Sequence, residues 1–475
     1  MSQEAANHES NRSSIFMLLR QSIKGEAFDY TQGNIKKAVI LLAIPMILEM
    51  VLESVFALVD LYFVGHLPDA SAAIQVVGLT ESVLSIIYAL AIGLSMATTA
   101  VVARRIGEKN PRLAAKAGMQ AINIAIFLNL VISILGYSYG KEILILMGAS
   151  ESTAVAGEPF IQITMAGSLI IVLLFLINGI FRGAGNAAIA MRSLWIANLS
   201  NIVLCPLLIN GLGPIPAYGL TGAAMATTIG RSLGVAYQIY VLSAGKGMLK
   251  VRLADMMPDV TQIIALIKIA TPAVLQFMIA SCSWIFLAQM VATTGGDHGS
   301  AGYQTALRLM MFFMLPAWGL SNAAATLVGQ NLGAKLVHRA EQSVIQTAIF
   351  SICFMAFVML SSFLFGRTLI SFFTTDPIVQ DIAVKATYIM SSGYIFYGIG
   401  MVLVNAFNGA GDTGTPTWIN FFGFWLFQIP LAYLLAKVFA MGPIGVFIAV
   451  PVAETAICIA GYVLFKKGKW KTIKV

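Results

Sequence analysis

Charged residues are scarce in this chain. Only 11% of its 475 residues are Asp, Glu, Lys or Arg, whereas 58% are hydrophobic and the mean hydropathy is +0.85. A soluble globular protein carries about a quarter charged residues, and its surface depends on them. The composition therefore excludes a soluble enzyme and a nucleic-acid-binding module, and it predicts an integral membrane protein.

Residues and motifs that hold metals or phosphates are also missing. The four cysteines lie in apolar runs without a C-x-x-C pair, so neither a disulfide framework nor a zinc site is indicated. The sequence has no G-x-x-x-x-G-K-[ST] phosphate loop and no H-E-x-x-H pair. We expect no enzyme activity, no bound metal and no cofactor.

Long apolar runs fill most of the chain. A membrane-spanning helix needs about 20 mostly apolar residues, and twelve segments meet that length in two sets of six. The first set is 38–64, 74–103, 114–138, 155–181, 189–210 and 219–243. The second set is 262–291, 301–328, 341–366, 379–407, 417–437 and 443–465. The prediction is an all-α membrane protein with twelve transmembrane helices in two six-helix lobes around a central cleft.

The basic residues indicate the orientation. With the N-terminus placed in the cytoplasm, 22 of the 29 Lys and Arg fall in cytoplasmic tails and loops, four fall outside and three lie in spans. Arg182 is among the 22, in the loop after the fourth span. This distribution predicts cytoplasmic termini and accounts for the net charge of +8 without a nucleic-acid partner. The predicted units are a tail over 1–37, an N-lobe over 38–245, a linker over 246–261, a C-lobe over 262–465 and a basic tail over 466–475.

The two halves are diverged copies of one another. The segment LAIPMILEM around Pro45 corresponds to IATPAVLQF around Pro272, an offset of 227. GLSMATTAVVARRIG from Gly93 corresponds to GLSNAAATLVGQNLG from Gly319, and RGAGN corresponds to NGAGD, both at an offset of 226. Parallel repeats of this kind build two facing bundles, and rocking of the bundles about a central site gives alternating access.

The same segments carry a resemblance to a known family. They are the P-x(14)-D pattern from Pro45 to Asp60, ARRIGEKN and GQNLGAK, NGIFRGAGN and NAFNGAGDTGTP, and NLSNIVLCPLLI. Together they resemble the multidrug and toxic compound extrusion (MATE) family of secondary antiporters, over roughly residues 35–465. The pattern is more similar to the DinF-type bacterial branch than to the NorM-type branch.

Ionisable groups within a span are costly and mark functional sites. Glu49, Glu53 and Asp60 share one stripe of the first span, at about 100° per residue. Such a ladder of acids is suited to relaying protons, or to attracting cationic substrates. The resemblance implies that Asp60 is the main coupling acid.

The resemblance also implies polar partners for Asp60 in the N-lobe. These are Asn178, Asn201, Cys205 and Thr227. Many relatives of this branch carry an acid where this chain has Cys205, so Glu53 is our candidate for a second acid.

Substrate contacts are expected in the second lobe. The run LRLMMFFMLPAWG is interrupted by Pro316 and Gly319, so it can line a cleft or pack helices. Met and aromatic side chains suit bulky organic cations. The candidates for cleft residues are Gln276, Arg308, Met311, Phe312 and Tyr397.

The sequence thus predicts a monomeric antiporter of the bacterial inner membrane, in contact with lipid. It would export amphiphilic, cationic drugs in exchange for protons. Two alternatives stay open. Sodium could be the coupling ion, although the second lobe lacks the acids typical of the NorM type, or the chain could be a flippase for a lipid-linked precursor.

Overall fold

The computed structural model describes residues 17–26, 28–65, 70–211, 213–245 and 249–473. Its long segments are helical because apolar residues run for 20 or more positions and satisfy their backbone groups within the helix. The N-lobe helices are α2 (Ile35–Gly65), α3 (Ala70–Gly107), α4 (Pro111–Ser138), α5 (Gly140–Leu146), α6 (Glu151–Ala166), α7 (Ser168–Gly183), α8 (Ala187–Asn210) and α9 (Gly219–Ala244). The linker holds the 3-10 turn η1 (Leu253–Met256).

The second half repeats this helical arrangement. Its helices are α10 (Val260–Gly333), α11 (Val337–Ser371), α12 (Pro377–Ser391), α13 (Tyr394–Ala410), α14 (Gly414–Asn420), the π-helical η2 (Phe421–Gln428), α15 (Ile429–Tyr433), η3 (Leu434–Val438), α16 (Pro443–Lys467) and η4 (Lys469–Thr472). Helices α14 to η3 run on without a break as one span, 414–438.

All twelve predicted segments are helical. The predicted spans 262–291 and 301–328 are the two parts of α10, which consists of two helices joined at a kink at Gly296, where φ is 61° and ψ is −158°. With α10 counted once, nine helices in the described part of the chain are long and apolar enough to cross a bilayer, or ten if α12 and α13, bent by 55°, count as one span. The predicted span 219–243 is α9, which is not among the nine.

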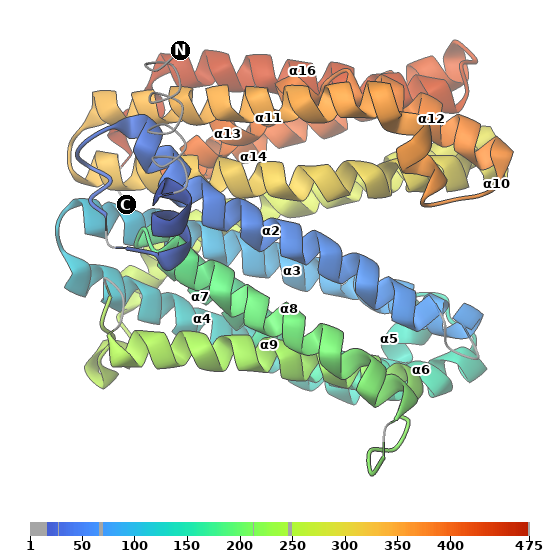
Figure 1. Cartoon of the computed structure of the whole chain (residues 1–475), viewed down its shortest axis with the longest axis horizontal. Helices are drawn as coiled ribbons and strands as arrows, with labels where there is room; N and C mark the ends of the chain where they lie inside the picture. The colour runs from blue at the N-terminus through green and yellow to red at the C-terminus, as the bar shows by residue number, and fades with distance from the viewer. Residues whose placement is uncertain (1–16, 27, 66–69, 212, 246–248, 474–475) are drawn as a thin grey trace, which may run out of the picture.

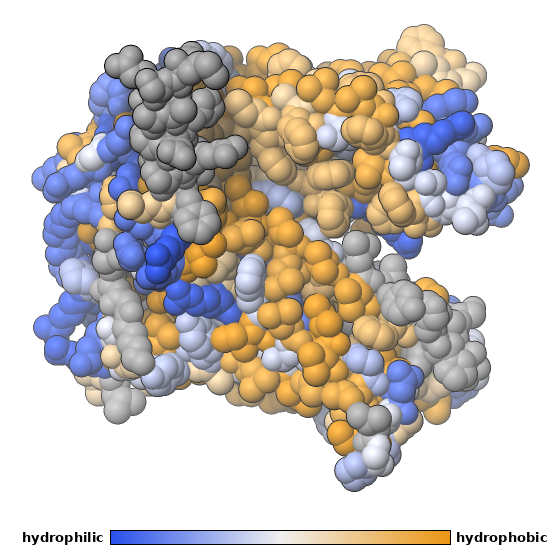
Figure 2. All heavy atoms as spheres, viewed as in Figure 1, coloured by the Kyte–Doolittle hydropathy of each residue, from blue (hydrophilic) through white to orange (hydrophobic). Residues whose placement is uncertain are grey.

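The two lobes are joined at one end and apart at the other. Figure 1 shows α2 to α9 in one bundle and α10 to α16 in the other, diverging away from the end that holds both termini. Figure 2 shows an open notch between the bundles at the right of the view, at the end opposite the joined one. Apolar side chains cover the middle of the visible face. We call the joined end the closed end and the notch the cleft.

Glycines allow the lobes to touch at the closed end. A Cβ at Gly107, the last residue of α3, would overlap the carbonyl oxygen of Gln330 on α10. A Cβ at Gly333, the last residue of α10, would likewise overlap the carbonyl oxygen of Arg104 on α3. The two glycines are 226 residues apart and occupy equivalent places in the repeat. The closed end is therefore a reciprocal contact that only glycine permits.

The two ends of the chain add to this contact. Residues 17–24 form a short helix, and the segment after it lies across both lobes. Arg339 of α11 donates to the carbonyls of Tyr30, Gln32 and Gly33, and Arg192 of α8 donates to those of Ile23 and Lys24. Arg104, which the sequence places in a loop, is buried and donates to the carbonyls of Ala410 and Ile473.

Candidate functional site: the cleft between the lobes

A cavity lies inside the cleft, mainly against the N-lobe. Its volume is about 320 Å³, and α2, α3, α7 and α9 wall it on one side and α10 on the other. We call it the central cavity. Its lining residues are Met50, Glu53, Phe56, Ala57, Val77, Glu81, Tyr88, Ile92, Phe175, Arg231, Leu315 and Trp318.

Three charged side chains stand among the apolar walls of the central cavity. Asn198 of α8 donates its amide N–H to Glu53 Oε2 at 2.9 Å. The Arg231 guanidinium lies over the rings of Phe56 and Tyr88, with 5.9 and 5.7 Å from its carbon to the ring centroids. With Glu81, the cavity holds two carboxylates and one guanidinium. Aromatic faces and carboxylates together attract an amphiphilic cation.

Two acids of the first span have different surroundings. Glu53 lines the central cavity, whereas Glu49, one turn earlier on α2, is fully buried. Asp60 belongs to α2, but its side chain lies outside the described part of the structure. Glu49 and Glu53, which helical periodicity places on one stripe, therefore do not share one environment.

Glu49 is part of a buried network inside the N-lobe. Its Oε1 accepts from Arg182 Nη1 and from Asn178 Nδ2, both at 3.1 Å. Asn178 Oδ1 in turn accepts from the Ser193 hydroxyl and the Gln238 amide, both at 2.7 Å. Because these two donors occupy the Asn178 carbonyl, its N–H groups must face Glu49. The network orients Asn178 toward an ionised carboxylate.

The prediction that Arg182 lies in a cytoplasmic loop was wrong, because the residue lies in the last turn of α7. The side chain is buried, pairs with Glu49 and donates Nη2 to the Ser95 hydroxyl at 3.1 Å. One signal in the sequence points to this pair. The repeat places Gln276 opposite Glu49 and Asn408 opposite Arg182, so both charges occur in the same copy.

The other predicted coupling residues lie deeper in the N-lobe. Asn201 donates to the Thr227 hydroxyl at 2.8 Å, which joins two of them. Thr227 lines a neighbouring cavity of about 240 Å³ that shares Glu81, Tyr88 and Arg231 with the central cavity. Cys205 is fully buried.

The predicted cleft residues of the second lobe do not form one site. Arg308 and Met311 are exposed and Phe312 is half-buried, and Arg308 and Met311 lie on the same helical face of α10 as Leu315 and Trp318. Gln276 is buried, and Tyr397 packs within the C-lobe core. None of the five lines the central cavity.

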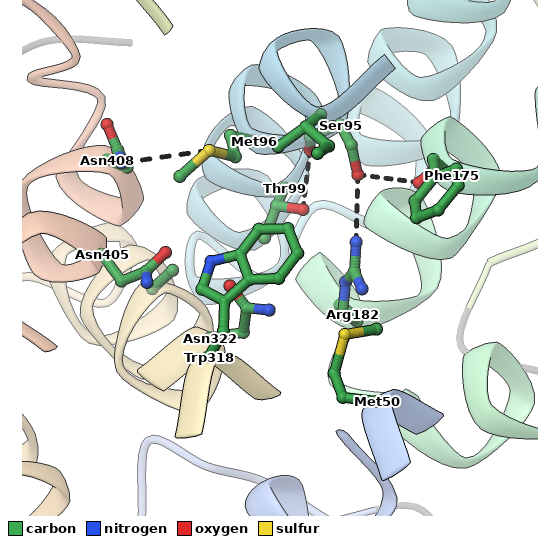
Figure 3. Close-up of a pocket in the computed structure, with 12 residues that line it drawn as sticks. Met50, Ser95, Met96, Thr99, Phe175, Arg182, Trp318, Asn322, Asn405 and Asn408 are labelled. Atoms are coloured by element: carbon green, nitrogen blue, oxygen red, sulfur yellow. Dashed lines mark hydrogen bonds between the residues drawn. The ribbon is translucent and has the colours of Figure 1, made fainter. Parts of the chain in front are cut away.

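A smaller pocket lies below the central cavity, toward the closed end. Its volume is about 20 Å³, room for about one water molecule. Figure 3 shows Ser95 and Arg182 on its N-lobe side, Asn405 and Asn408 on its C-lobe side, and Trp318 and Asn322 between them. We call it the apex pocket. Sequence reasoning named none of its three asparagines.

Two paired helical bundles with a cleft between them are the architecture of a multi-pass membrane transporter. The MatE family profile matches residues 45–207 and 272–434, one stretch in each half. The second stretch begins and ends 227 residues after the first. The chain belongs to the MatE family.

Named relatives span nearly the whole chain. It is 26% identical to the probable multidrug resistance protein NorM of Thermotoga maritima, over 92% of this chain and 94% of that protein. It is 26% identical to an FAD transporter of Shewanella oneidensis, over 87% and 90% of the two chains. The multidrug export protein MepA of Staphylococcus haemolyticus is 24% identical, over 90% and 93%.

Solved structures share the fold. A multidrug resistance MATE family transporter in the outward-facing conformation superposes with a TM-score of 0.86 and 26% identity, over 92% of this chain and 96% of that chain. A transporter from Pyrococcus furiosus, described as having a binding pocket of reverse polarity, superposes with a TM-score of 0.87 and 25% identity, over 94% and 98%.

Proposed function

We propose that this chain is a secondary active exporter that moves amphiphilic organic cations out of the cell in exchange for protons. The central cavity carries the proposal, because it combines aromatic and apolar walls with the carboxylates of Glu53 and Glu81. Relatives named multidrug resistance and export proteins support the same class of substrate. Each chain contains a complete cleft, so we expect a monomer to be active.

The conformation suits alternating access. The lobes are packed at one end and separated at the other, so rocking about the closed end would expose the cavity to each side in turn. The sequence places the termini in the cytoplasm through its excess of Lys and Arg there. On that assignment, the cleft opens to the outside of a bacterial inner membrane.

Protons are the coupling ion that the Glu53 site supports best. Asn198 presents an N–H to the carboxylate, whereas a hard cation such as sodium requires several oxygen ligands. A carboxylate with one amide donor, facing a cavity, can take up and release a proton as the cavity changes sides. Asp60 is the main coupling acid in this proposal, on the family pattern from Pro45, and Glu53 is the second.

The mutations that test the coupling are Glu53→Gln and Asp60→Asn. In proteoliposomes with an imposed proton gradient, each variant should lower efflux of a fluorescent organic cation at least tenfold, while Glu151→Gln, an exposed carboxylate outside the cavity, retains wild-type efflux. Near-normal coupled efflux by Glu53→Gln would remove Glu53 from the mechanism.

A flippase remains the second candidate, favoured by the positive charge of Arg231 within the central cavity and of exposed Arg308 on α10. Movement of a lipid-linked anionic precursor across vesicles, with no efflux of organic cations, would establish it instead.

A further inference from the structure

The apex pocket lies where the two lobes converge. It shares Met50, Ile92, Phe175 and Trp318 with the central cavity above it. Below it, the C-lobe already holds the end of α7, because Thr326 donates to the Arg182 carbonyl at 3.1 Å and Gln330 donates to the Gly183 carbonyl at 3.0 Å. A new bond across the apex pocket would therefore form on the cleft side of these contacts.

The internal repeat gives this pocket two unequal halves. In the N-lobe two of the four polar positions are charged and hydrogen bonds link all four, whereas in the C-lobe all four are neutral. The equivalent positions, within one residue of the repeat offset, are Glu49 and Gln276, Ser95 and Ser321, Asn178 and Asn405, and Arg182 and Asn408. The serine has a different partner in each half: Arg182 donates to Ser95 at 3.1 Å, whereas Asn405, the equivalent of Asn178, donates to Ser321 at 2.8 Å.

Both halves contain buried acceptors without a donor. Asn405 and Asn408 are 2% and 1% exposed, and the Oδ1 atom of each lacks a hydrogen-bond partner. Oε2 of fully buried Glu49 also lacks one. A buried acceptor without a donor destabilises the conformation that contains it, so these atoms favour any change that brings a donor to them. The guanidinium of Arg182 lines the same pocket and carries five N–H donors.

We propose that Glu49 is a proton-binding site that controls a switch of Arg182 between the lobes. A hydronium ion from the bulk solution gives up its proton to the Glu49 carboxylate and becomes water, and the resulting neutral acid loses its charge attraction for Arg182. The guanidinium then turns across the apex pocket and donates to the amide oxygens of Asn405 and Asn408. This contact draws the lobes together above the closed end and narrows the cleft. The proposal rests on the proton-coupled function above and names a further acid for it.

Few charges bear on Glu49. In the part of the chain that the structure describes, the charged groups acting on its carboxylate are Arg182 from α7 and Glu53 from its own helix. The helices α3, α8, α9 and α10, which pack near it, add no other charge to this set. Arg182 is therefore the group whose position a proton on Glu49 would change.

Distances between spin labels at the mouth of the cleft test the switch without substrate or gradient. The labels are placed at Leu146→Cys in the N-lobe and Phe372→Cys in the C-lobe, 86% and 80% exposed, with exposed Cys282 and Cys353 replaced by serine. The wild type should shift toward shorter distances as the pH falls from 8 to 5. Glu49→Gln should show the short distance at both values. Asn405→Leu combined with Asn408→Leu leaves the Glu49–Arg182 pair intact, and this variant should keep the long distance at pH 8 and at pH 5.

The proposed switch is contradicted if the distance between the labels in Glu49→Gln changes with pH as it does in the wild type. The same result in the variant with both Asn405→Leu and Asn408→Leu would also contradict it. It is also wrong if the wild type shows no response. Proton-driven efflux is measured separately in vesicles, so a failed switch with intact antiport overturns only this inference. An intact switch without proton-driven efflux overturns the proposed function instead.

Discussion

Glu49 and Glu53 are one helical turn apart on α2, yet they differ in what they can do. Glu49 is enclosed and paired with Arg182, so a change in its charge acts on the protein around it. Glu53 lines the central cavity and has one amide donor, so a change in its charge acts on whatever occupies the cavity. In our proposal, Glu49 therefore controls the conformation, whereas Glu53 binds the coupling ion and faces the substrate.

Glu81 should contribute to cation binding through its charge. Replacing it by Gln keeps the shape of the cavity wall and removes one of two carboxylates. Two unit charges about 4 Å apart in water attract by about 1 kcal/mol, so Glu81→Gln should raise the Kd of a monovalent organic cation about fivefold. The measurement is fluorescence titration of purified protein in detergent. A neutral ligand of similar size should bind unchanged, and equal weakening of both ligands would contradict an electrostatic role.

Asp259 fixes the linker to the N-lobe and gives a prediction for pH. It caps the start of α10 by accepting from the backbone N–H groups of Thr261 and Gln262, and it accepts from Lys116 Nζ at 2.7 Å. The hydrogen bond from Lys116 holds the pKa of Asp259 below its ordinary value of 3.8. An acid with a lowered pKa in the folded state stabilises that state above the unfolded pKa, and this contribution is lost as the pH falls through the folded value.

Asp259→Asn should therefore lower the Tm in detergent at pH 7. The difference from wild type should shrink as the pH falls below about 4, because the carboxylate is then protonated in the unfolded wild type, and it should vanish once the pH passes below the lowered pKa of Asp259 in the folded protein. A Tm difference that is the same at pH 7 and pH 3 would show that the charge of Asp259 does not matter.

At the scale of elements, the ends of α3 and α10 form the hinge region of the molecule. Gly107 and Gly333 let the two helices approach until backbone touches backbone. Overpacking a tight contact costs about 1–3 kcal/mol, which is enough to shift a balance between two conformations about fivefold or more. Gly107→Ala and Gly333→Ala should each loosen the closed end.

A buried reporter measures that loosening. Thr326→Cys, at a fully buried position between the lobes, should react slowly with a maleimide in a background without Cys282 and Cys353. Gly107→Ala should accelerate the reaction at least fivefold. Gly78→Ala is the matched control, since Gly78 is on the same helix and a Cβ added there would meet no atom within 4 Å. In the Gly78→Ala protein, the cysteine introduced by Thr326→Cys should react at the rate seen without a glycine substitution. Equal rates for all three proteins would exclude a hinge at this contact.

Elements were predictable from sequence where one strong physical rule applied. Apolar runs of spanning length located the long helices, because the bilayer demands them. The division of α10 was predicted too, because the break at Gly296 falls in the gap between the predicted spans 262–291 and 301–328. The Glu49–Arg182 pair was missed because Arg182 follows the fourth apolar run, where positive charge is the ordinary signal of a cytoplasmic loop.

At the scale of the whole molecule, contacts between the lobes are concentrated at one end. Glycine contacts join α3 to α10, and Arg192 of the N-lobe and Arg339 of the C-lobe both bind the segment before α2. The cleft opens at the other end, with the central cavity at its base and the apex pocket beneath. This order places Glu49 and Glu53 between the hinge and the open side.

The central claim is that a proton gradient alone drives export through this cleft. The direct measurement is efflux of a fluorescent organic cation from proteoliposomes of the wild-type protein, with a proton gradient or a sodium gradient imposed in turn. The account predicts saturable efflux under the proton gradient and none above background under the sodium gradient. Efflux that follows sodium, or that follows neither ion, would contradict it.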